Sequence, residues 1–204
     1  MLAASGRASP EFCRNAEHRL NDSTDGEDSR EALRQLAAPK VTVPIREAFG
    51  DESGTLAGII SAANRDVAIR FGLDADNCPK HPSFCTREWV TADLSRGERY
   101  FVLEDGGVPV ACVAYETPNA EIAYLNRLSV LPEWRRRGYG EQLVAHVIAL
   151  ARAVAIPAIS IGVIGEHEDL QRWYRKQGFV DGESKRFPHL PFAVKYMRYA
   201  VKQD

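Results

Sequence analysis

The residues best suited to do chemistry lie in one short segment, Arg135-x-x-Gly138-x-Gly140, which directly precedes an amphipathic stretch. Backbone N–H groups at the start of a helix lack intrahelical partners and carry the positive end of the helix dipole. Glycines lack Cβ atoms, so a ligand can approach the backbone closely. Arg136 and Arg137 add a local positive field. The spacing is typical of a turn that binds phosphate groups, although a tight connection without a ligand would have the same pattern.

Two other kinds of chemistry receive less support from the sequence. Cys78-x-x-His81-x-x-x-Cys85, with His189 elsewhere, offers residue types that bind zinc, but a structural zinc site needs a firm fourth ligand and usually closer pairs. We therefore expect no metal. The chain also lacks a Gly-x-Ser-x-Gly elbow, which argues against a covalent hydrolase.

The elements that position these residues can be predicted from hydrophobic periodicity and turn residues. Residues 1–39 have few large apolar side chains, and we expect a disordered or weakly helical tail. Residues 40–204 form one predicted α/β domain. We expect strands over 41–48, 100–103, 108–116, 121–131, 158–164 and 193–201, with a further strand near 179–187. We expect helices over 53–64, continued or restarted over 67–72, and over 86–97, 138–155 and 168–177.

Composition excludes several classes of protein. The 204 residues carry a formal net charge of −2, so no nucleic-acid or anionic-membrane partner is expected. The four cysteines are scattered, as expected for free thiols in a reducing compartment. Neither a secretory signal nor a run of apolar residues long enough to span a membrane is present. We expect a soluble, cytoplasmic protein.

The segment around the turn resembles the cofactor motif of the GNAT superfamily of N-acetyltransferases, Arg/Gln-x-x-Gly-x-Gly/Ala. The strand before it and a second block downstream also match the family pattern. The matching residues are Leu128-Ser129-Val130-x-Pro132, Ile161-x-Val163 and Tyr174-x-x-x-Gly178-Phe179. Agreement in order and spacing covers 124–179, and a weaker strand pattern extends it to 41 and 201.

The resemblance implies a mixed, mostly antiparallel α/β (α+β) sheet of six to seven strands with about four helices. That sheet is splayed between its fourth and fifth strands. It also implies acetyl-CoA as cosubstrate, with pantetheine on the backbone of Leu128, Ser129 and Val130. By resemblance, the pyrophosphate is held by N–H groups of the run Arg136, Arg137, Gly138, Tyr139 and Gly140. Arg135 organises the turn or touches a phosphate.

Catalytic roles also follow from the resemblance. Tyr174 matches the general acid that protonates the coenzyme A thiolate. Many relatives have a Glu that acts as general base where this chain has Tyr124, so the identity of the base is undecided. Asn126, on the same strand face as Tyr124, could position a water. Glu121 is nearby but faces the opposite side of the strand unless a bulge intervenes. His167 replaces a frequent Asn and could act as base or keep that residue's hydrogen-bonding role.

The acceptor implied by the resemblance is a primary amine that the sequence does not identify. His81, His189 and Tyr124 are expected to belong to the acceptor pocket. A second hypothesis is a catalytically weak module that binds acyl-CoA as a sensor or scaffold. The absence of the strand Glu motivates this hypothesis. A third is that the tail docks a protein partner. The expected oligomeric state is a monomer or homodimer.

Overall fold

The structure is a computed structural model that describes residues 43–202, so the predicted tail over 1–39 lies outside the described residues. No helix within 43–202 has the length and apolar character needed to cross a membrane. The strands and α-helices are β1 (Ile45–Glu47), α2 (Ser53–Phe71), α3 (Arg87–Ser95), β2 (Arg99–Asp105), β3 (Val108–Glu116), β4 (Ala123–Val130), α4 (Tyr139–Ala153), β5 (Ala158–Ile164), α5 (Glu168–Lys176), β6 (Val180–Arg186) and β7 (Ala193–Ala200). Short 3-10 helices are η1 (Gly50–Glu52), η2 (Pro82–Phe84) and η3 (Pro132–Trp134).

The seven strands form one sheet in the order β1-β2-β3-β4-β5-β7-β6. Only the β4–β5 pair is parallel, and all other neighbours are antiparallel. The expected mixed, mostly antiparallel fold with four main helices is therefore confirmed. The first strand is shorter than the predicted 41–48 and begins only after Pro44, which has no N–H to donate to a strand ladder.

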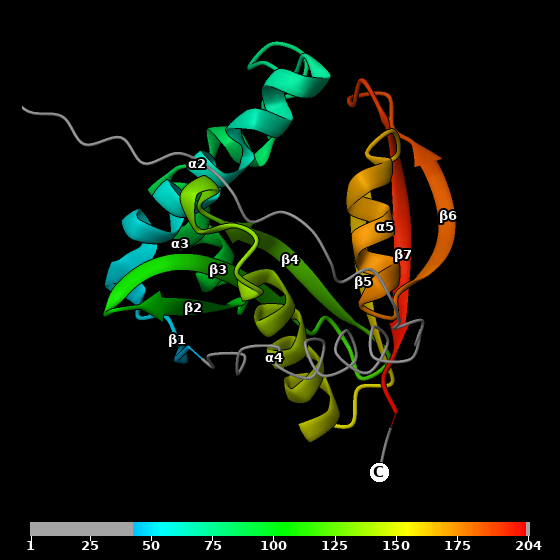
Figure 1. Cartoon of the computed structure of the whole chain (residues 1–204). Helices are drawn as coiled ribbons and strands as arrows, with labels where there is room; N and C mark the ends of the chain where they lie inside the picture. The colour runs from blue at the N-terminus through cyan, green and yellow to red at the C-terminus, as the bar shows by residue number, and fades with distance from the viewer. Residues whose placement is uncertain (1–42, 203–204) are drawn as a thin grey trace, which may run out of the picture. The chain divides into compact units, whose positions relative to one another are not determined.

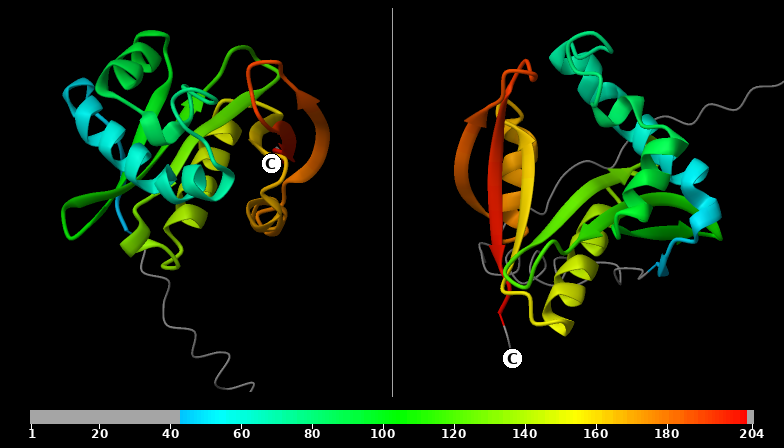
Figure 2. Two further views of the ribbon diagram at one scale, coloured as in Figure 1. Left: turned by 90° about the horizontal axis from the view of Figure 1, so that it is seen from above. Right: turned by 180° about the vertical axis from the view of Figure 1, so that it is seen from behind.

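Strands β4 and β5 separate soon after they meet. Their backbones pair only at Ala123 with Ile159 and at Tyr124 with Ser160. Figure 1 shows the two strands close at one end of the sheet and far apart at the other, and the rear view in Figure 2 agrees. Beyond Tyr124, β4 pairs with β3 alone, so one side of its backbone has no strand partner. This is the splay that the family resemblance implied.

A β-bulge interrupts β4 at Arg127. Cys112 of β3 lies opposite Ser129, but Ala114 lies opposite Asn126, so Val113 alone spans two residues of β4. Arg127 has a φ of 55°, which is uncommon for a residue other than glycine. Because a bulge adds one residue, it reverses the alternation of side chains along the rest of the strand.

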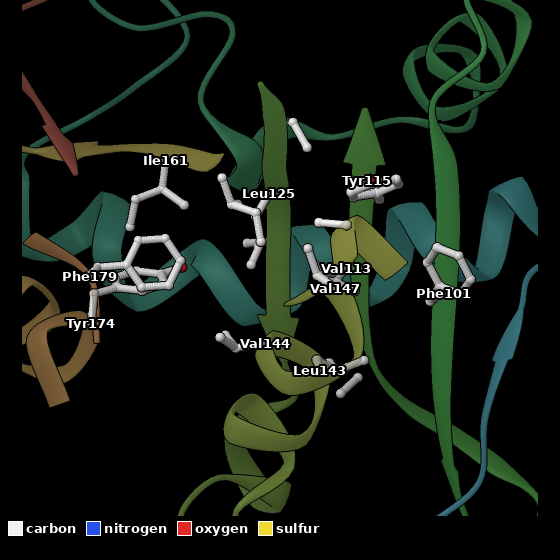
Figure 3. Close-up of a cluster of buried hydrophobic side chains, with 14 of the residues drawn as sticks. Phe101, Val113, Tyr115, Leu125, Leu143, Val144, Val147, Ile161, Tyr174 and Phe179 are labelled. Atoms are coloured by element: carbon white, nitrogen blue, oxygen red, sulfur yellow. The ribbon is translucent and has the colours of Figure 1, made fainter. Parts of the chain in front are cut away.

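Helices cover the two faces of the sheet. Helix α4 places its apolar stripe on one face, in a cluster drawn in Figure 3 that includes Leu143, Val144, Val147, Val113 and Leu125. Helices α2 and α3 cover the other face through a second cluster that includes Leu56, Ile60, Val90, Tyr100 and Val102. Helix α2 is continuous, and Gly72 ends it in the left-handed conformation with a φ of 61°.

Candidate active site

A cavity of about 400 Å³ lies between α2, the end of β4, the turn before α4 and the start of α5. Its lining includes residues of the strand predicted to bind pantetheine and of the turn predicted to bind the pyrophosphate, with Trp134 between them: Leu128, Ser129, Val130, Trp134, Arg135, Arg136, Tyr139 and Gly140. The structure thus brings the two parts of the predicted cofactor site, the strand and the turn, to one hollow.

The turn at the start of α4 leaves its amides open. Gly138 is the N-cap residue with a φ of 80°, and no side chain caps the helix. Among the described residues, the first N–H groups of α4 therefore have neither an intrahelical nor a side-chain partner, and they carry the positive end of the helix dipole. Such an end is suited to bind an anion.

The sequence predicts that Gly140 opens the backbone of the turn to a ligand, but the structure gives a different reason for a glycine at this position. A Cβ at this position would lie 3.2 Å from Cζ2 of Trp173 on α5. The absent side chain therefore allows α5 to pack closely on α4, rather than simply opening the turn to a ligand. The Trp173 indole also donates a hydrogen bond to Glu141 at 3.1 Å, which fixes the same contact.

Arg135 connects three elements. Its guanidinium donates to the carbonyl of Ala63 and to the carboxylate of Asp66 on α2, both at 2.6 Å, and to the carbonyl of Val130 at 3.3 Å. The same hydrogen bonds lower the pKa of Asp66. Of the two roles expected for Arg135, these contacts favour organising the turn over touching a phosphate.

The next two arginines differ in their surroundings. Arg137 lies over the ring of Trp134, 4.5 Å from its centroid, and 3.8 Å from Asp105. The hydroxyl of Tyr139 also donates to Asp105, so Arg137 and Tyr139 both contact the same carboxylate on β2. Arg136 lines the cavity and has no ion-pair partner within 43–202. Arg136 is therefore the arginine most available to a ligand in the cavity.

A second cavity, of about 260 Å³, continues into the gap between β4 and β5. The two cavities share Asn64, Val67, Leu128, His167 and Leu170, so they form one passage from the turn of α4 to the space between the splayed strands. The side of β4 that has no strand partner borders this passage.

Tyr174 lines the second cavity. It is buried, with 5% of its surface exposed, and makes edge contacts with Trp173 and Phe179. Figure 3 shows its ring beside Phe179, extending from α5 toward β4. Burial raises the pKa of the Tyr174 phenol. The hydroxyl therefore keeps its proton at neutral pH, as a proton donor must.

His167 lines both cavities and caps α5. Its Nδ1 accepts a hydrogen bond from the N–H of Leu170 at 3.3 Å. Burial lowers the pKa of His167, so the neutral ring is favoured. With Nδ1 as acceptor, the proton of the neutral ring is on Nε2. The geometry favours a hydrogen-bond donor over a base.

The other predicted residues divide into two groups. Asn126 and His81 line the second cavity, and Asn126 donates to the carboxylate of Glu116 at 3.2 Å. Tyr124, Glu121 and His189 line neither cavity. Glu121 is exposed and precedes β4, and the bulge comes after Asn126, too late to reverse its parity relative to Tyr124. His189 is exposed and contacts Phe187. The structure does not bring these three residues to either cavity, and their roles stay predictions.

Three cavity neighbours were missed from the sequence. Asn64 of α2 donates to Ser129 of β4 at 3.3 Å, and Arg70 of α2 lines the first cavity while pairing with Asp169 at 3.2 Å. Arg127 lines the second cavity. Arg127 is the single charged residue of β4, and a charged residue inside a strand at the centre of a sheet was the available signal.

The zinc-like spacing does not produce a metal site in the described part of the chain. Cys78 and Cys85 are buried free thiols, and Nδ1 of His81 is 2.9 Å from the hydroxyl of Ser83. Residues 43–202 contain no group of three or more His, Cys, Asp or Glu side chains arranged to hold a metal.

Sequence comparison identifies the family. The model of the acetyltransferase (GNAT) family matches residues 69–179, more than half of the chain. The chain belongs to the GNAT family. This GNAT chain is 25% identical over 175 residues to an amino-acid acetyltransferase of Neisseria meningitidis serogroup A, and 28% identical over 92 residues to one of Ectopseudomonas mendocina. These matches cover 83% and 45% of the chain but only 36% and 20% of the relatives' own lengths.

Solved structures share the GNAT fold. The ribosomal-protein-S18-alanine N-acetyltransferase of Escherichia coli superposes with a TM-score of 0.64 at 14% identity, over 80% of this chain and 96% of that one. The protein yncA of Salmonella typhimurium, solved with its cofactor acetyl-CoA, gives a TM-score of 0.56 at 16% identity, over 80% and 96%. At these identities the likeness concerns the fold alone.

The residues present fit acetyl-CoA on grounds internal to this chain. The uncapped start of α4 offers amides to a diphosphate, and the unpartnered side of β4 offers backbone groups to an extended amide-bearing arm. Buried backbone groups are normally paired, so an edge of this kind along a cavity is suited to a ligand that completes the pairing.

Proposed function

We propose that this chain is an N-acetyltransferase that moves the acetyl group of acetyl-CoA directly to a primary amine. One observation carries the proposal: a continuous passage joins the uncapped start of α4 to the phenol of Tyr174, along the unpartnered side of β4. A passage of this form holds a long cosubstrate at one end and leaves room for an acceptor at the other.

The cosubstrate would be held mainly by backbone. The amides from Arg136 to Gly140 would bind the diphosphate, and the backbone of Leu128, Ser129 and Val130 would pair with pantetheine. Arg136 would add positive charge, while Arg135 holds the turn against α2. Acetyl-CoA would supply the acetyl group as a thioester.

Proton movement is assigned to residues of the second cavity. Transfer forms a C–N bond and breaks a C–S bond, so one proton must leave the nitrogen and one must reach the sulfur. Tyr174 would donate its phenolic proton to the sulfur. His167, with its proton on Nε2, would orient groups in the passage by donating a hydrogen bond. Positioning the amine beside the thioester would supply much of the acceleration.

The route for the proton that leaves the amine involves Asn126. Its amide nitrogen donates to Glu116, which leaves its amide oxygen to accept a hydrogen bond from a water or the amine. Glu116 is the carboxylate that Asn126 binds, and it lies opposite Tyr124 on the neighbouring strand β3. Asn126 is thus a positioning residue, and water would carry the proton.

A coupled assay tests the proposal. The full chain is incubated with acetyl-CoA and a panel of primary amines, thiol release is recorded, and products are identified by mass spectrometry. We expect amine-dependent thiol release and a product that is heavier than the amine by one acetyl group in place of one hydrogen. Release without an amine product would contradict the proposal.

The sensor alternative rests on one observation. In the described part of the chain, Asp66 is the single carboxylate residue that lines either cavity, and it is paired with Arg135. A site without an available base would suit binding without turnover. Tight coenzyme A binding by calorimetry, with no turnover on any amine, would favour this alternative over the transferase.

A further inference from the structure

The second cavity contains one charged residue that the proposed chemistry does not use. Arg127 is the single charged side chain that lines it, and no Asp or Glu of the described residues does so. Its side chain is 22% exposed, so most of that side chain is out of water. A charge held in a cavity lined mainly by apolar residues is costly unless a partner of opposite sign is present.

The structure gives Arg127 a weak partner. Its nearest carboxylate oxygen, Oδ2 of Asp93, is 3.6 Å away, beyond hydrogen-bond distance. Both oxygens of Asp93 are already engaged, Oδ1 by Arg96 and Oδ2 by the hydroxyl of Tyr100 at 2.8 Å. Among the described residues no hydrogen bond uses the guanidinium donors of Arg127, whose ring contact is with Trp89 at 6.0 Å.

The backbone at Arg127 also suggests a functional reason for its placement. The residue is the extra one in the bulge and has a φ of 55°. A non-glycine residue in this conformation costs roughly 1–2 kcal/mol of stability. Strain of this kind is concentrated at binding and catalytic sites, where the surrounding structure maintains it.

A second donor lies on the same cavity. Nδ1 of His81 accepts from the N–H of Ser83 at 3.2 Å, so the neutral ring carries its proton on Nε2. His81 is 5% exposed, and its position at the start of η2 is fixed by this cap. Arg127 and His81 thus give the acceptor end of the passage an excess of donors.

We propose that the acceptor is a small amino acid, whose carboxylate binds Arg127 and His81 while its amine faces the thioester. This inference rests on the proposed function and adds the substrate class. Arg127 directly precedes Leu128, which lines both cavities. A carboxylate bound by Arg127 would therefore lie near the place where the two cavities meet. One short molecule could carry both that carboxylate and the reacting amine. A cavity of about 260 Å³ is also small for a folded protein segment.

The test uses matched acceptors. Rates are measured for a panel of L-α-amino acids and for the corresponding amino-acid amides, which keep the amine and lose the negative charge. We expect kcat/KM to be roughly 10- to 100-fold higher for the acids, as for a hydrogen bond to a charged group. Equal rates for acids and amides would overturn the inference, and so would a preference for peptide N-termini over free amino acids.

Three variants separate recognition from folding. Arg127→Gln is expected to raise KM for the acids roughly 10- to 100-fold and to affect the amides much less. Arg127→Lys keeps the charge beside Asp93 but loses the paired geometry of the guanidinium, so an intermediate KM is expected. Arg96→Gln is the matched control, because Arg96 binds the same Asp93 yet lines neither cavity.

The outcomes distinguish the two proposals. If Arg96→Gln and Arg127→Gln change KM and the melting temperature alike, Arg127 serves only as a counter-ion for Asp93 and the inference fails. If the wild-type chain acetylates no amine at all, the proposed function fails. If it acetylates neutral amines as readily as amino acids, only the substrate class fails.

Discussion

Tyr174 illustrates how burial prepares a single side chain for its task. Its ring is enclosed by Trp173 and Phe179, and the resulting loss of solvent raises the pKa of the phenol. We predict that Tyr174→Phe lowers kcat by about 10²- to 10⁴-fold, the usual contribution of a general acid, and changes the Kd for acetyl-CoA by less than about threefold. Steady-state kinetics and calorimetry measure the two quantities.

The Phe variant keeps the ring and its edge contacts, so its melting temperature serves as the folding control. An unchanged kcat would remove Tyr174 from the proton route. A large loss of acetyl-CoA affinity would show instead that the hydroxyl binds the cosubstrate.

His167 gives a prediction about protonation. With its pKa below the ordinary 6.5, the ring is neutral across the range from about 6.5 to 8. If it acts as a donor from Nε2, then His167→Asn, which can still cap α5 and donate a hydrogen bond, should keep most of kcat. His167→Ala should lose both functions and reduce kcat roughly tenfold or more.

The dependence of kcat on pH shows whether His167 acts as a hydrogen-bond donor or as the general base. We expect wild type and His167→Asn to have the same dependence of kcat on pH between 6 and 8. Loss of an acidic limb in the Asn variant alone would establish His167 as the base.

The sequence allowed some of these residues to be predicted and not others. Tyr174 and His167 were predicted through the family resemblance, from their spacing to Gly178 and to each other. Arg127 could not be placed in the same way. Its orientation depends on a bulge, and alternation along a strand predicts side-chain direction only while the pairing register is unbroken.

At the scale of elements, the contact between α4 and α5 is controlled by one glycine. A methyl group at Gly140 would lie 3.2 Å from the Trp173 ring, closer than ordinary packing allows. We predict that Gly140→Ala destabilises the chain by about 1–3 kcal/mol and weakens acetyl-CoA binding, because α5 must shift. Urea unfolding and calorimetry provide the measurements.

The matched control is Gly58→Ala in α2. A Cβ there meets nothing within 4 Å, so the substitution should stabilise the helix by about 0.5–1 kcal/mol. If both glycine variants behave alike, helix propensity rather than the Trp173 contact explains Gly140.

The positions of most helices and strands agree with hydrophobic periodicity, since each has one face on a core cluster. The splay between β4 and β5 was expected only through the family resemblance. Periodicity alone does not show which strands are neighbours, and nothing in the two apolar runs limits their pairing to two residues each.

At the scale of the whole molecule, one buried and two partly buried histidines give stability a pH dependence. Burial lowers the pKa values of His81, His146 and His167, and Nε2 of His146 is buried without a hydrogen-bond partner in the part of the chain that the structure describes. For each, the unfolded chain binds more protons than the folded one, so stability is present above the unfolded pKa of about 6.5 and decreases as the pH falls below it.

We therefore predict that the melting temperature decreases by a few degrees between pH 7.5 and 5.5. His146→Gln should reduce this slope, because burial lowers the pKa of His146. Carboxylates with lowered pKa values, such as Glu47 with its hydrogen bonds from Arg99, titrate below this window and do not contribute to it. A melting temperature that rises on acidification would contradict the assignment.

The two-residue junction between β4 and β5 has a consequence for the mechanics of the domain. Strands β1 to β4 are joined to strands β5 to β7 in the sheet by the pairs at Ala123 and Tyr124 alone, and side-chain packing must supply the remaining cohesion. A molecule that occupied the open side of β4 would bridge the two halves like an inserted strand. Substrate loading and mechanical reinforcement would then be the same event, and an empty domain would be the one most easily pulled apart.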